Sequence, residues 1–266
     1  MTEGNPAVAD LLRVDVADRV AVLTLDRPDR LNAIGTATAD RIESTLDELR
    51  GDASVRALVF AGAGRGFSAG ADLDEIEAFR TAYEFRAFVG RLTEVFGRLQ
   101  EFGKPSVAAI HGFALGGGLE LALACDLRVA ERGAKLGLPE MKLGVLPGAG
   151  GTQRLARLIP AAVAKQMILT GEPIDAERAY ALGLVNELAE PGAALEVATA
   201  LAARMAAGAP LALAAGKQLI EAGATADLDS AIGYERETVS VLFSSWDRGE
   251  GLRAFRERRA PRFRGA

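Results

Sequence analysis

Three consecutive glycines, Gly116 to Gly118, connect an apolar strand-like run at residues 106–110 to an apolar helix expected over residues 119–125. Glycine lacks a β-carbon, so such a run lets the backbone approach a ligand closely. The helix is apolar on every side except at Glu120, a pattern typical of a buried helix. Since an unpaired buried charge costs free energy, the sequence predicts a carboxylate inside a core.

A second carboxylate follows in the same segment. Pro139-Glu140 opens what we expect to be another short helix, and Gly148-Ala149-Gly150-Gly151 starts a third. Either glutamate alone is explained by its place in the first turn of a helix, where the macrodipole or a capping box favours an acidic residue. Two carboxylates and two glycine-rich helix starts so close together indicate instead a built functional site.

Bulk composition limits the fold and the chemistry. The 266 residues are 49% apolar, which is ample for one large domain or one domain with an appendage. A single cysteine, Cys125, excludes an intrachain disulfide and a multi-cysteine metal site. With His111 as the only histidine, we expect packing roles for both residues rather than a nucleophilic pair. Residues 1–10 show no secretion signal and no membrane span is visible, so a cytoplasmic location is expected.

Charge is distributed unevenly along the chain. The net charge is −5, yet residues 248–266 contain seven arginines against Glu250 and Glu257. An acidic chain is a poor general nucleic-acid binder. Two interpretations of the basic tail stay open: a solvated helix end with a disordered terminus, or contact with a small phosphorylated ligand.

The order of the predicted elements indicates an α/β fold. Apolar periodicity predicts a hairpin over residues 12–25, helices over 36–49, 81–102, 161–169 and 176–182, strands over 55–60, 106–110, 127–130 and 184–188, and nearly continuous helix over 195–258, with breaks at 208–210 and 223. Strand, helix and strand in that order imply βαβ units and a mainly parallel sheet. The C-terminal third is expected to be a helical appendage.

A glycine-rich loop at residues 61–73 invites comparison with dinucleotide-binding motifs. Gly62-x-Gly64 is followed by Phe67 where the third glycine should stand, and no acidic residue ends a following strand in the expected place. No glycine run here carries the lysine of a Walker loop. We therefore expect Asp72 to cap a helix and the loop to present backbone N–H groups to a ligand.

The glutamate pair indicates chemistry on water. If both helix starts face one cavity, desolvation and mutual repulsion separate the pKa values of Glu120 and Glu140. One carboxylate then takes a proton while the other delivers one. A reaction beside a carbonyl also needs an oxyanion hole, for which the N–H groups of Ala71 and Gly117 are candidates, each typically worth ~3–4 kcal/mol in the transition state.

Three segments together carry a family resemblance. Phe67-Ser-Ala-Gly-Ala-Asp-Leu73, Ala114-Leu-Gly-Gly-Gly-Leu-Glu-Leu-Ala122 and residues 139–155 (PEMKLGVLPGAGGTQRL) closely resemble the enoyl-CoA hydratase (crotonase) family. The resemblance implies a ClpP/crotonase-like spiral of ββα units over residues 1–192, which holds the active site. It also implies a C-terminal helical region, residues 193–266, that builds trimers, often paired into hexamers.

The resemblance also implies roles for individual residues. Glu120 corresponds to the water-activating glutamate, Glu140 to the partner that protonates the α-carbon, and Ala71 and Gly117 to the oxyanion donors. The residues implied to bind coenzyme A or the acyl substrate are Arg30, Ala69, Ala71, Asp72, Leu73, Asp74, Gly117, Phe255 and Arg258. Phe255 and Arg258 match tail positions that reach the coenzyme A of a neighbouring subunit, which favours the phosphate interpretation of the basic tail.

The expected activity is hydration of a trans-2-enoyl-CoA to a 3-hydroxyacyl-CoA, with no metal and no redox cofactor, because coenzyme A is part of the substrate. Two alternatives stay open within the fold: a Δ3,Δ2-enoyl-CoA isomerase, and a hydratase of a branched or aromatic acyl-CoA. A remote alternative is a non-catalytic RNA-binding or scaffold protein that uses the arginine tail. Residues 74–102 carry no pattern that fixes the length or branching of the acyl chain.

Overall fold

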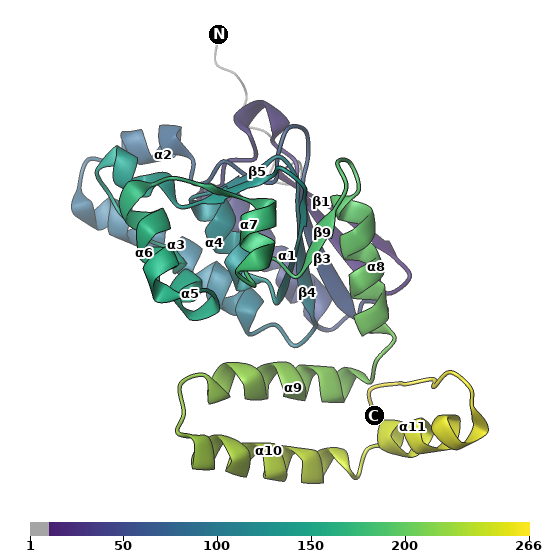
Figure 1. The fold of residues 1–266 in the computed structure, drawn as a ribbon. Coiled ribbons are helices and arrows are strands. Elements are labelled where there is room, and N and C mark those ends of the chain that lie inside the picture. Colours follow the sequence, from purple (N-terminus) through teal and green to yellow (C-terminus); the bar gives the residue numbers. More distant parts are fainter. Residues whose placement is uncertain (1–10) are drawn as a thin grey trace.

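The computed structural model describes residues 11–266, so the predictions made on residues 1–10 lie outside it. Its main sheet has six strands in the order β1-β2-β3-β4-β6-β9 (Figure 1). The strands are β1 (Leu12–Ala17), β2 (Val20–Leu25), β3 (Ala57–Gly62), β4 (Ser106–Ile110), β6 (Leu127–Glu131) and β9 (Glu187–Ala189). Only β1 pairs antiparallel with its neighbour, and the other pairs are parallel, as the predicted βαβ order requires.

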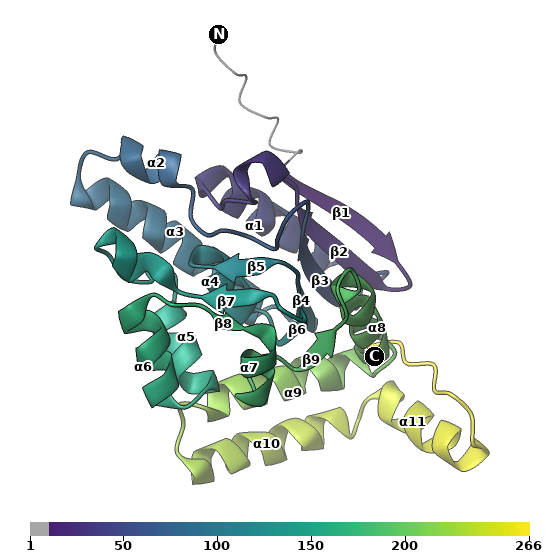
Figure 2. The ribbon, with the colours of Figure 1, turned by 45° about the horizontal axis from the view of Figure 1, so that its top comes forward.

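A second, three-stranded sheet lies beside the first. Its strands are β5 (Phe113–Leu115), β7 (Lys135–Gly137) and β8 (Ile174–Asp175), in the order β5-β7-β8. From β4 to β7 the strands of the chain alternate between the two sheets, since β4 leads into β5 and β6 leads into β7 (Figure 2). This alternation confirms the predicted spiral arrangement.

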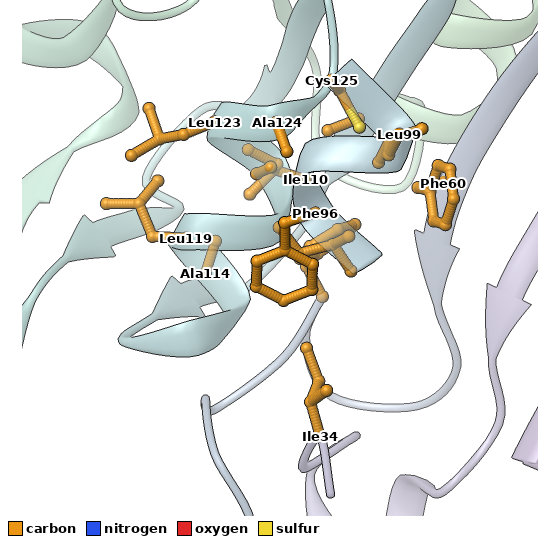
Figure 3. Close-up of a cluster of buried hydrophobic side chains, with 14 of the residues drawn as sticks. Ile34, Phe60, Phe96, Leu99, Ile110, Ala114, Leu119, Leu123, Ala124 and Cys125 are labelled. Carbon is orange, nitrogen blue, oxygen red and sulfur yellow. The ribbon is translucent and has the colours of Figure 1, made fainter. Parts of the chain in front are cut away.

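Helices cover both faces of the main sheet. On one face the buried side chains of α1 (Thr36–Arg50), α3 (Ala82–Gln100) and α4 (Gly117–Ala124) join the larger core cluster. Figure 3 shows part of it, where Phe60, Phe96 and Ile110 gather around α4. Cys125 lies in this cluster, where burial raises the pKa of its thiol to about 12. The expected packing role of Cys125 is therefore confirmed.

The opposite face of the sheet is covered by α8 (Ala194–Ala206). Its buried side chains are four alanines spaced four residues apart: Ala194, Ala198, Ala202 and Ala206. They pack on small and β-branched residues of β2, β3, β4 and β6 in a second core cluster. The expectation that the whole helical stretch from residue 195 is an appendage is therefore wrong for α8. Its small alanine side chains allow the helix to pack closely against the sheet.

The helices that project from the body are α9 (Pro210–Gly223), α10 (Leu228–Leu242) and α11 (Trp246–Glu257) (Figures 1 and 2). Neither α9 nor α10 has a buried residue. The chain bends by 108° between α8 and α9, at the predicted break around Pro210. No single helix within residues 11–266 has the length and apolarity to cross a membrane, although α8 and α9 taken together pass that test.

The basic tail is ordered and folds back along α11. Asp247 accepts hydrogen bonds from the backbone N–H groups of Arg264 (2.7 Å) and Gly265 (2.8 Å). Glu250 accepts from the Arg259 guanidinium (2.6 Å), which is the largest reason that the pKa of Glu250 falls to about 2. The alternative of a disordered terminus is therefore wrong.

Six shorter helices complete the described part of the fold: the 3-10 helices η2 (Pro28–Arg30) and η3 (Pro139–Leu143), and α2 (Leu73–Ala78), α5 (Gly151–Leu158), α6 (Ala161–Thr170) and α7 (Ala176–Ala181). The last strand is shorter than predicted, beginning at Glu187 rather than 184. Leu184 donates its N–H to Ala179 at the end of α7, so these residues close a helix instead of pairing in the sheet.

Candidate active site

A cavity of about 1200 Å³ opens beside the glycine run. Its walls come from the loop before α2, the first half of α3, the start of α4, η3 and the loop that leads into α5. Both glutamates singled out in the sequence line it. Elements far apart in the chain therefore meet at one concave site, the usual form of a small-molecule pocket.

Glu120 lies in the first turn of α4 and is only 3% exposed. Its Oε1 accepts hydrogen bonds from the backbone N–H groups of Ala149 and Gly151, each at 2.8 Å. Burial raises the pKa of this carboxyl, and the two N–H groups and the nearby Arg154 oppose the rise. Within residues 11–266, Oε2 accepts no hydrogen bond, so one oxygen is anchored and the other is left for a ligand.

Glu140 lies in the first turn of η3, against the glycine run. Gly116 adopts φ +51, and a β-carbon there would stand 2.9 Å from Glu140 Oε1. Both the backbone conformation and the space beside Glu140 therefore favour glycine at this position. Glu140 Oε2 is buried without a hydrogen-bond partner among the described residues. Burial first, and the charge of Glu120 second, raise the pKa of Glu140 to about 7.

The two carboxyls differ in their hydrogen-bond partners. Backbone N–H groups favour the ionised form of Glu120, whereas Glu140 Oε2 has no donor that would stabilise a negative charge. Burial raises the pKa of both carboxyls, and the hydrogen bonds to Glu120 oppose the rise there, so Glu120 is the better placed of the two to carry a negative charge.

The backbones of Ala71 and Gly117, the two candidate oxyanion donors, meet at the cavity. A β-carbon on Gly117 would lie 3.3 Å from the nitrogen of Ala71, so the two backbones are in close approach. Across the part of the chain that the structure describes, neither the Ala71 nor the Gly117 N–H donates a hydrogen bond. The residues on either side of Ala71 do pair with Ile34: Gly70 O accepts from the Ile34 N–H, and the Asp72 N–H donates to Ile34 O. Two unused donors beside one cavity suit a developing oxyanion.

The loop before α2 is held rigidly at the mouth of the cavity. Asp72 caps α2 through the N–H groups of Asp74 and Glu75, and its Oδ2 pairs with Arg27 at 2.8 Å. Although burial opposes it, the Arg27 guanidinium holds the pKa of Asp72 below its usual range. Arg30 pairs with Asp74 at the same edge. The predicted capping role of Asp72 is confirmed.

A family model described as enoyl-CoA hydratase/isomerase matches residues 15–266. The chain belongs to the enoyl-CoA hydratase/isomerase family. It is 41% identical to the short-chain-enoyl-CoA hydratase of Clostridium acetobutylicum, over 91% of this chain and 92% of that protein. It is also 41% identical to the 2,3-dehydroadipyl-CoA hydratase of Escherichia coli, over 96% and 98%. The crystal structure of an enoyl-CoA hydratase from Bacillus anthracis superposes with a TM-score of 0.93 at 36% identity, covering 96% of this chain and all of that one.

In this enoyl-CoA hydratase/isomerase fold, most of the predicted site residues come together. The residues of the prediction that line the cavity are Arg30, Ala69, Ala71, Asp72, Leu73, Asp74, Gly117, Glu120 and Glu140. Phe255 and Arg258 do not: they lie at the end of α11, where Phe255 is 84% exposed (Figure 1). Within one chain these two residues lie outside the cavity.

Sequence reasoning missed the apolar wall of the cavity and the residues behind Glu120. Phe85 and Val89 of α3 line the cavity, in a segment whose sequence predicted a helix but not which of its side chains would face a pocket. Arg154 bonds the Ala149 carbonyl behind the glutamate. The available signal was an arginine one turn into a helix that begins with two glycines.

No group of three or more His, Cys, Asp or Glu suited to a metal occurs in residues 11–266.

Proposed function

We propose that this enzyme adds water to a trans-2-enoyl-CoA thioester to give a 3-hydroxyacyl-CoA. One observation carries the proposal: two buried carboxyls line the same cavity, one of them hydrogen-bonded by two backbone N–H groups and the other without a donor on Oε2 among the described residues, beside the backbones of Ala71 and Gly117. The family relationship supports it, because the relatives described above are named as hydratases of CoA thioesters.

The proposed reaction begins with the thioester carbonyl against the N–H groups of Ala71 and Gly117. Glu120 Oε2 takes a proton from water, and the water oxygen forms a bond to C3. The electron pair of the C2=C3 bond moves toward the thioester carbonyl, where the two N–H groups stabilise the negative charge. Glu140 then delivers its proton to C2. One water is consumed, and both carboxyls recover their initial protonation by exchange with solvent.

The reaction needs no change of oxidation state, so we expect neither a metal nor a redox cofactor to take part. Coenzyme A enters as part of the substrate. Arg30, Ala69 and residues 72–74 stand at the cavity mouth, where the proposal assigns them to the coenzyme A moiety. The apolar side chains of Phe85, Val89 and Leu92 line the part assigned to the acyl chain.

The proposed working unit is a homotrimer or a dimer of trimers. Large apolar side chains on α9, α10 and α11 are exposed, among them Ile220 (75%), Val241 (75%) and Phe255 (84%). Apolar surface on this scale is typical of subunit contacts. In such an assembly we propose that Phe255 and Arg258 reach the coenzyme A of a neighbouring subunit.

The test is a substrate panel. Purified protein is mixed with crotonyl-CoA and longer, branched and aromatic 2-enoyl-CoA thioesters, and loss of absorbance of the conjugated double bond is followed. Hydration predicts a loss that Glu140→Gln prevents. No loss with any substrate contradicts the proposal. A gain of absorbance from 3-enoyl-CoA thioesters instead favours the isomerase, and a salt-sensitive RNA mobility shift that requires residues 253–266 favours the RNA-binding alternative.

A further inference from the structure

The loop that holds Glu120 is itself held from behind. Glu120 Oε1 takes its two hydrogen bonds from Ala149 and Gly151, which flank the peptide between Ala149 and Gly150. Arg154 Nη1 donates to the carbonyl oxygen of that peptide at 2.8 Å. This peptide joins the two peptide groups that carry the donors, so the position of its carbonyl oxygen sets how the two N–H groups are spaced and oriented toward the carboxylate.

Gly150 makes this arrangement possible. It adopts φ +104, a conformation that L side chains rarely adopt. A β-carbon there would stand 2.1 Å from Arg154 Nη1, so the guanidinium occupies the space that a side chain would need. The loop and the arginine are therefore fitted to each other, not merely adjacent.

Arg154 is anchored on its other side by a chain of hydrogen bonds that leads to the C-terminal helices. Its Nε donates to Gln100 Oε1 of α3 at 2.8 Å. Gln100 Nε2 then donates to Glu221 Oε2 of α9 at 2.5 Å. The Gln100 amide satisfies a guanidinium and a carboxylate only in this one orientation, since its oxygen accepts and its nitrogen donates. The chain of contacts runs from the projecting α9 to the proposed base.

We propose that Arg154 is a positioning residue for Glu120, and that Gln100 and Glu221 hold Arg154 in place. The guanidinium fixes the Ala149–Gly150 peptide so that both N–H groups stay on Glu120 Oε1, and Oε2 stays aimed at water. The proposal rests on the hydration proposed above, in which Glu120 takes the proton. Arg154 touches neither the substrate nor the reacting atoms.

The charge of Arg154 adds a second effect that can be measured separately. The charged groups that influence the proton affinity of Glu120 are Glu140 from η3 and Arg154 from α5, and Arg154 itself faces Glu221. Arg154 lowers the pKa of Glu120. Glu120 must be ionised to act as a base, so removing the cation should move the acidic limb of the rate profile to higher pH.

The test compares Arg154→Met, Arg154→Lys and Gln100→Leu with wild type. Arg154→Met should lower kcat by about 10- to 100-fold, since a small misplacement of a catalytic group has effects of that size, with KM little changed and the acidic limb moved upward in pH. Arg154→Lys should keep the limb in place and lose part of kcat. Gln100→Leu should lower kcat less, without moving the limb. Arg157→Ala is the control, because among residues 11–266 the hydrogen bonds of this exposed arginine of the same helix go only to Gln153.

A readout without substrate separates this inference from the proposed function. The ¹³C carboxyl resonance of Glu120, assigned by its loss in Glu120→Gln, is titrated in wild type and in Arg154→Met. A rise in the pKa of Glu120 in the variant supports the positioning role. This holds even if wild type hydrates no thioester, a result that would contradict the proposed function alone. An unchanged resonance and unchanged kcat in Arg154→Met overturn the inference. If Arg154→Met does not fold, Gln100→Leu and Arg154→Lys with wild-type kcat overturn it equally.

Discussion

Gly117 and Ala71 bring their backbones so close together that a β-carbon on Gly117 would lie 3.3 Å from the Ala71 nitrogen. Contacts of this kind are tighter than most side chains tolerate. The two residues come from different parts of the chain, one at the start of α4 and the other in the loop before α2. Their approach brings together the two N–H groups of the proposed oxyanion hole.

Gly117→Ala should disable this pair of donors. The new methyl group crowds the Ala71 N–H and the space for the carbonyl oxygen, so we expect kcat to fall by about 10²–10³-fold, the usual effect of losing one oxyanion donor. Steady-state hydration assays test this. Gly90→Ala is the control, since nothing lies within 4 Å of its added carbon on α3. Equal activity in both variants would remove Gly117 from the proposed oxyanion hole.

Glu120→Gln and Glu140→Gln should each lower turnover by about 10²–10⁴-fold while product binding remains. If both carboxyls act on one water, the double variant should be little worse than either single variant. The measurements are kcat for each variant and calorimetric affinity for a 3-hydroxyacyl-CoA. Losses that multiply in the double variant would show that the two groups act in separate steps.

The rate should fall on the alkaline side of neutrality. Glu140 is proposed to deliver a proton, so it must be protonated, and its pKa of about 7 means that the active form is lost as pH rises through that value. A profile of kcat/KM against pH should therefore show a descending limb near pH 7. An activity that keeps rising well above pH 7 would reverse the roles of Glu120 and Glu140.

Glu140 should also lower stability in neutral and alkaline solution. Its folded-state pKa is raised above the ordinary value of 4.5 to about 7, so its favourable contribution is complete below pH 4.5 and is lost as pH rises through 7. Glu140→Gln should then melt about 2–4 °C higher than wild type near pH 8, a size discounted for partial exposure. The two proteins should melt alike near pH 4. A difference that does not depend on pH would mean that packing, not ionisation, is responsible.

Arg258→Ala tests the proposed assembly. If the tail reaches the coenzyme A of a neighbouring subunit, removing the guanidinium should raise KM for CoA thioesters several-fold with less effect on kcat, because the phosphates are remote from the reacting carbons. Light scattering should give a trimer or hexamer for wild type and variant. Arg256→Ala on the same exposed helix end is the control. A fully active monomer, or an unchanged KM, contradicts the idea.

Much of the site was predictable from sequence because its residues stand in unusual local contexts. A lone glutamate in an otherwise apolar helix, next to three glycines, identified Glu120, and the helix-start position of Glu140 identified its partner. Arg154 was not predictable in the same way. Its role depends on the carbonyl of Ala149 and the amide of Gln100, and only the folded chain brings α3 to α5.

The misassignment of α8 has a similar cause. The sequence pattern predicted a helix here, but the face that the sheet buries consists of alanines spaced four apart. Alanine is common in any helix, so this stripe carries little weight in a hydropathy pattern. Its partners are equally small, including Ala57 and Ala109 on the sheet. The packing of α8 on the sheet therefore depends on small side chains that allow a close approach, not on large apolar ones.

The place of α8 also constrains how the protein emerges from the ribosome. Strands β1 to β4 and β6 are complete by residue 131, but one face of their sheet is covered only by a helix that ends at Ala206. Until about three quarters of the chain has been synthesised, that face of valines and alanines has no cover and is open to wrong partners. A nascent chain stalled before residue 194 should therefore require a chaperone, whereas one released from the ribosome tunnel beyond residue 206 can close its own core.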